Sequence, residues 1–140
     1  MTDHLETAGA RVLGASEIEM NVPAGGEYLS VLRTAAAGLA ARLNFTLDDI
    51  EDLRIAVDEA CSMLLAQANT HSRLDCRFIL GENSIGFRAS VNADNPTLPA
   101  KDGFAWTVLT ALASDVDVRV SAPDVLTIEL SRGRPAQGLE

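Results

Sequence analysis

Hydrophobic and polar residues alternate along the second half of the chain in four short runs, which predict four β-strands. Strict alternation gives each strand one apolar face and one face in contact with water. The apolar members of the runs are Leu74, Cys76, Phe78 and Leu80; Ile85, Phe87, Ala89, Val91 and Ala93; Val116, Val118 and Val120; and Leu126, Ile128 and Leu130. A shorter run with the same alternation over residues 16–22 predicts one further strand.

Apolar residues at helical spacing predict three helices, over about residues 27–43, 47–68 and 104–113. Thr46 is a good N-cap for the second helix, and carboxylates crowd its first turn, where the helix dipole favours negative charge. The resulting order is β-α-α-β-β-α-β-β. It predicts an α+β protein, a two-layer α/β sandwich whose mostly antiparallel sheet is covered on one face by helices.

The length of 140 residues fits one domain, which we expect over residues 15–132 between disordered tails at 1–14 and 133–140. No apolar run approaches the roughly 20 residues that span a bilayer, and the first residues lack the pattern of a secretory signal. Cys61 and Cys76 fall on core-facing positions, where reduced thiols are the expected state. These features predict a cytoplasmic protein that does not contact membranes.

The chain is acidic, with 20 Asp and Glu against 11 Lys and Arg and a net charge of −9. This balance argues against direct binding of nucleic acid and favours a basic protein partner. His4, His71 and the two cysteines are too dispersed to predict a zinc site. The glycine patterns of α/β-hydrolases, P-loop proteins and dinucleotide-binding folds are absent from the sequence.

A second stripe on the long helix is predicted to lie roughly opposite its apolar stripe. It contains Asp52, Ala56, Glu59 and Met63, at intervals that align them along one face. Glu59 is either a solvated helix carboxylate or a general base, and spacing alone does not choose between these interpretations.

The same helix resembles a known motif. Residues 49–63, DIEDLRIAVDEACSM, are similar to the N-box helix of the anti-sigma-factor serine protein kinases, members of the GHKL (Bergerat-fold, HATPase-like) ATPases. Residues 103–118, GFAWTVLTALASDVDV, resemble the segment that follows the nucleotide lid in that family. The resemblance covers about residues 18–130 with the same element order. The residues of the two motifs look most similar to those of the actinobacterial branch.

The resemblance implies roles for four residues, with ATP and Mg²⁺ as the cofactors. Glu59 matches the general base. Asp94 lies within one residue of the aspartate that contacts the adenine amino group, and Gly103 matches the first glycine at the phosphate end. Arg33, on the first helix, matches the arginine through which relatives contact the sigma factor and its competitor.

Three features depart from the family pattern. Met63 replaces the asparagine that would bind Mg²⁺, and a thioether is a poor ligand for a hard cation, so no metal ligand is predicted. Ala105 replaces the second glycine of the phosphate segment. Residues 95–102 form a short, glycine-free connection where relatives have a long glycine-rich lid.

Three functions remain open at this point. The first is an anti-sigma factor that sequesters an alternative sigma factor, of the stress or sporulation type, and is released by partner switching with an anti-anti-sigma protein. The second is an active ATP-dependent serine protein kinase that phosphorylates the anti-anti-sigma factor. The third is a divergent scaffold for another interaction. Relatives dimerise, so the resemblance also implies a homodimer, and small residues at Ala37, Gly38 and Ala41 would let a partner or a second copy approach the first helix.

Overall fold

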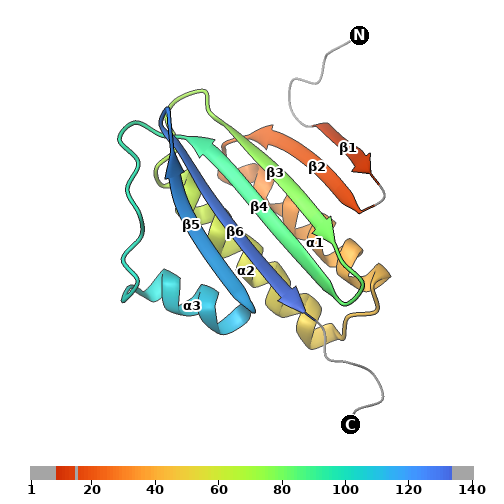
Figure 1. Ribbon diagram of the computed structural model, residues 1–140. Coiled ribbons are helices and arrows are strands. Elements are labelled where there is room, and N and C mark those ends of the chain that lie inside the picture. The colour runs from red at the N-terminus through yellow and green to blue at the C-terminus, as the bar shows by residue number, and fades with distance from the viewer. Residues whose placement is uncertain (1–8, 15, 134–140) are drawn as a thin grey trace.

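The alternating runs pair into one antiparallel sheet of order β1-β2-β3-β4-β6-β5 in a computed structural model that describes residues 9–14 and 16–133 (Figure 1). The strands are β1 (Gly9–Gly14), β2 (Glu17–Pro23), β3 (Arg73–Leu80), β4 (Ser84–Asn92), β5 (Asp115–Ser121) and β6 (Val125–Gly133). The fold class predicted from the sequence is confirmed.

Strand β1 is missing from the prediction. A disordered tail over residues 1–14 is wrong for residues 9–14, which pair antiparallel with β2. This short segment carries no long alternating run, and its strand conformation depends on hydrogen bonds to β2, which a local pattern does not encode. Residues 1–8 and 134–140 of the two expected tails lie outside the described residues.

The helices lie on one face of the sheet (Figure 1). A short 3-10 turn, η1 (Gly26–Tyr28), precedes α1 (Leu29–Arg42), and α2 (Leu47–Leu65) and α3 (Phe104–Leu112) complete the layer. Asn44, with a φ of 63°, ends α1 in the left-handed region, which asparagine tolerates. Thr46 then caps α2 as predicted, because its hydroxyl accepts a hydrogen bond from the Asp49 backbone N–H at 3.1 Å.

The core lies between the sheet and the helices. Phe78 and Phe87 face each other across β3 and β4 with ring centroids 5.1 Å apart, and both are fully buried. Cys61 on α2 and Cys76 on β3 are buried, free thiols, as expected. A hydrogen bond with Cys61 and burial raise the pKa of Cys76 well above its ordinary value. Among residues 9–14 and 16–133, no helix has the length and apolar content needed for a bilayer crossing.

Candidate functional site

The second stripe of α2 does not form a separate, solvent-facing surface. Ala56 is 1% exposed, and Met63 is half-buried against the apolar core. The prediction that this stripe lies opposite the core is therefore wrong at these two positions. The reason is that α2 packs against α1, α3 and the sheet, so more than one side of the helix is covered. Glu59 is half-buried on the same helix.

Arg132 of β6 joins the start of α2 to the end of α3. Its Nη2 atom lies 2.7 Å from Oδ1 of Asp49 and 3.1 Å from Oδ2 of Asp52, and its Nη1 atom donates to the backbone carbonyl of Leu112. The hydrogen bond from Arg132 is the main cause that lowers the pKa of Asp49, against the opposing effect of burial. This contact fixes α3 beside the helix that carries Glu59.

A hydrogen-bonded clasp holds the connection between β4 and α3. The side-chain amide of Gln67 donates to the carbonyl of Thr97 and accepts from its N–H, each at 2.9 Å. Nearby, Asn69 Nδ2 donates to Oδ1 of Asp94 at 3.4 Å, and the Asp94 side chain is exposed. The connection is therefore attached to the segment that follows α2.

Gly103 begins α3 for a structural reason. Its backbone N–H donates to the carbonyl of Ala100 at 3.0 Å, and a Cβ atom added at Gly103 would lie 3.2 Å from that same oxygen. The missing side chain thus serves the turn that enters α3, and the glycine is explained without a phosphate group.

Met63 does not fit the role of the Mg²⁺ ligand that the family resemblance predicts at its position. Within the described ranges there is no group of three or more His, Cys, Asp or Glu residues placed to hold a metal ion. Met63, at the position of the expected ligand, offers a thioether that packs against the core. Asp94 is exposed and hydrogen-bonded to Asn69, and a Cβ atom at Gly103 would crowd the Ala100 carbonyl. The expected Mg²⁺ position therefore offers a sulfur atom in place of a hard oxygen ligand.

Arg33 forms a contact between the first two helices. Its Nη1 atom lies 3.3 Å from Oδ1 of Asp58, and the two side chains are 38% and 37% exposed. The structure therefore places Arg33 and Glu59 on neighbouring helices, and Asp94 and Gly103 towards the two ends of the β4–α3 connection. The sequence offered no signal for the Arg33–Asp58 pair, since the partners are 25 residues apart.

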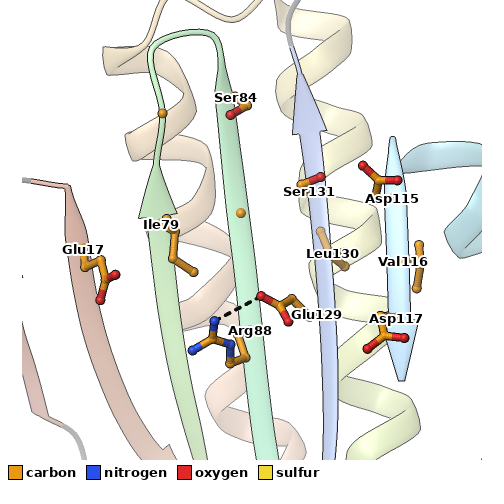
Figure 2. A pocket seen from close by; sticks show the side chains of 12 residues that line it. Glu17, Ile79, Ser84, Arg88, Asp115, Val116, Asp117, Glu129, Leu130 and Ser131 are labelled. Atoms are coloured by element: carbon orange, nitrogen blue, oxygen red, sulfur yellow. Dashed lines mark hydrogen bonds and ion pairs between the residues drawn. The ribbon is translucent and has the colours of Figure 1, made fainter. Parts of the chain in front are cut away.

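A hollow with a volume of about 560 Å³ lies on the opposite, open face of the sheet (Figure 2). None of the predicted site residues lines it. Figure 2 shows Arg88 directed towards Glu129, with 3.1 Å between Nη2 and Oε2. Burial raises the pKa of Glu129, but hydrogen bonds from Arg88 and Arg119 outweigh it, so this pKa lies below its ordinary value.

Sequence comparison finds relatives of this chain among anti-sigma factors and serine-protein kinases. No family model matches the chain. The anti-sigma-F factor RsbW of Mycobacterium tuberculosis is 36% identical over 112 residues, which cover 80% of this chain and 66% of that protein. The serine-protein kinases RsbW of Bacillus thuringiensis and Bacillus cereus are 46% identical over 52 residues, which cover 37% of this chain and 32% of each kinase. The match thus spans just under two thirds of the mycobacterial relative.

Proposed function

Because the chain belongs to the family of RsbW anti-sigma factors and serine-protein kinases, we propose that it is an anti-sigma factor, which binds and sequesters an alternative sigma factor in the cytoplasm. The observation that carries this proposal is the 36% identity to an anti-sigma-F factor over 80% of the chain. A net charge of −9 supports it, because a sigma factor binds DNA and presents basic surface that an acidic protein attracts.

The outer side of α1 and α2 is the surface we assign to the sigma factor. Arg33 and Asp58 form an exposed ion pair there, and Val31 and Ile55 are each 40% exposed. Gly38 lies in the middle of α1, where a Cβ atom would meet no other atom within 4 Å. No packing within the described residues therefore requires this glycine, which costs about 1 kcal/mol relative to alanine. Close approach of a partner explains it.

Release would follow when an anti-anti-sigma protein competes for the same surface. The family resemblance extends this proposal to a homodimer. The second candidate, an active serine protein kinase, is favoured by the names of the Bacillus relatives. The donor set around Glu59 opposes it, because Met63 is no ligand for Mg²⁺.

Capture of the purified cognate sigma factor tests the first proposal. Arg33→Glu should weaken capture at least tenfold, because it reverses a charge at the centre of the assigned surface and repels Asp58. Arg77→Glu is the matched control, since Arg77 has a similarly exposed side chain in an ion pair but lies on β3, on the open face of the sheet. Equal affinity of the wild-type chain and Arg33→Glu would contradict the assigned surface, and no capture by the wild-type chain would contradict the function.

Titration with a fluorescent ATP analogue tests the kinase alternative. We expect no Mg²⁺-dependent binding at micromolar concentrations, given the thioether at Met63. Saturable binding that requires Mg²⁺ and is abolished by Glu59→Ala or Asp94→Ala would instead support the kinase. Met63→Asn is the informative variant, because it restores the amide oxygen that the family resemblance predicts at this position.

A further inference from the structure

Strand β5 forms one edge of the sheet. Among the strands of residues 9–14 and 16–133, it pairs with β6 alone. The connection over residues 95–102 runs down the same side of the molecule before it enters α3 (Figure 1). Within the described parts of the chain, no backbone hydrogen bond joins this connection to β5. The outer edge of β5 therefore presents N–H and C=O groups that an additional strand can pair with.

Apolar side chains beside this edge are only partly covered. A small hollow of about 70 Å³ is lined by Leu98, Trp106, Val116 and Val118 among others. Leu98 is 58% exposed, and Val120, further along the same face of β5, is 44% exposed. Exposed apolar groups that gather at one place indicate an interaction surface. The 95–102 connection borders the hollow through Pro99 and Lys101, whose ammonium group lies 5.5 Å from the centre of the Trp106 ring, but among the described residues it forms no backbone hydrogen bond with β5 and leaves Leu98 and Val120 exposed.

The other face of β5 is acidic. Asp115 and Asp117 point to the open side of the sheet, two residues apart. Asp117 is 68% exposed and contacts Arg119, which also contacts Glu129, so one guanidinium group is shared between two carboxylates. No ion pair of Asp115 is found in the part of the chain that the structure describes. This face of the edge therefore attracts positive charge.

We propose that β5 is a docking edge for an extended segment of a partner protein, in which apolar and basic side chains alternate. An added strand would satisfy the free backbone groups of β5, which a helix cannot do. Its successive side chains point to opposite faces, so one set would enter the hollow beside Trp106 and the other would lie opposite Asp115 and Asp117. The edge lies away from Arg33, and the proposal holds whether or not the client is a sigma factor.

A competing explanation is that the carboxylates only prevent edge-to-edge association of two copies. The two explanations differ in what they predict for a basic strand. An edge that is only protected repels acidic strands and binds no partner, whereas a docking edge binds a basic alternating strand and discriminates against an acidic one.

The test uses the full chain and its single tryptophan, Trp106, which lines the hollow. The probe is a seven-residue peptide of alternating valine and arginine, with a valine–glutamate peptide as the charge control. A third peptide repeats the basic sequence with N-methylated backbone on the pairing edge. We expect a saturable blue shift of Trp106 emission with the basic peptide only, and affinities at least tenfold weaker for the other two. No shift, or equal binding of the N-methylated peptide, would overturn the proposal.

Two pairs of variants separate local from general effects. Asp115→Arg should weaken binding about tenfold, whereas Glu27→Arg makes the same change in net charge at an exposed site in η1 and should not. Val120→Asp should likewise weaken binding, and Val31→Asp, at a similarly exposed valine on α1, should not. Circular dichroism verifies that each variant is folded. Equal losses of peptide affinity within either pair would show that the peptide binds through net charge or through non-specific hydrophobic contact. Either result would overturn the docking edge.

Discussion

Two groups of arginines and carboxylates join elements of this fold in contrasting surroundings. The side chain of Arg132 is 20% exposed and contacts Asp49, which is 11% exposed, between the helix layer and the sheet. Arg119, 47% exposed, contacts Glu129 on the open face of the sheet. The residue types are the same, but water screens the second pair more strongly. Burial, and the number of elements joined, should therefore decide how much each pair contributes to stability.

The largest effect is expected for Arg132→Ala. This change leaves Asp49 desolvated without its counter-ion and leaves the carbonyl of Leu112 without its donor. Loss of one partner of a buried pair costs about 3–5 kcal/mol, so we expect a loss near 3 kcal/mol for a pair that is still partly exposed. Urea denaturation followed by circular dichroism measures it. A loss below about 1 kcal/mol would show that burial does not distinguish the two groups.

The pH dependence of stability is the next largest effect. The pKa of Asp49 is lower in the folded chain than its ordinary value of 3.8, so the folded state favours the charged carboxylate. The stabilisation is complete above the unfolded pKa and is lost as pH falls through the folded pKa. The free energy of unfolding should therefore decrease steeply below about pH 4. Arg132→Ala should flatten this decrease, whereas Glu129→Gln, on the exposed side, should leave most of it.

A neutral contact provides an intermediate case. Gln67→Ala removes both hydrogen bonds of the clasp to the backbone of Thr97, and each exposed hydrogen bond contributes roughly 0.5–1.5 kcal/mol. We expect a global loss of about 1 kcal/mol and faster hydrogen exchange at the Thr97 N–H. Thr97→Ala is the control, because the bonds run to the backbone, and it should leave both quantities nearly unchanged.

The smallest effect is expected for Arg119→Ala on the open face. Exposed ion pairs contribute about 0.2–1 kcal/mol, and Glu129 keeps its second partner, Arg88. The expected loss is below about 0.5 kcal/mol, and it should shrink further in 1 M salt, because salt screens exposed charges. A loss comparable to that of Arg132→Ala would remove the contrast between the two groups.

Local patterns predicted most of the framework. Alternation located β2 to β6, and helical spacing with the Thr46 cap located α1, α2 and α3, because these signals lie within single elements. Alternation also carried an unused signal: continuing the core-facing series of β6 beyond Leu130 places Arg132 on the same face, where a charged residue requires a partner.

The features that were missed depend on partners distant in sequence. β1 forms through its pairing with β2, and the clasp joins Gln67 to Thr97 over 30 residues. The second stripe on α2 has the predicted spacing along one helix face. Spacing within one helix could not show that neighbouring elements cover Ala56. The motif residues Glu59, Asp94 and Gly103 lie where the element order predicts. The roles that the resemblance implies for them depend on which ligand atoms come together around them. Only the assembled fold shows those atoms.

The reactivity of the buried thiols of Cys61 and Cys76 reports how often the core opens. Neither sulfur meets solvent while the core is closed, and the raised pKa of Cys76 keeps that thiol protonated. A thiol reagent therefore reacts only when α2 separates from β3, so its rate depends on how often the core opens as well as on its own chemistry. A partner that holds α2 in place slows this reaction, so the core can register an event that takes place on the surface.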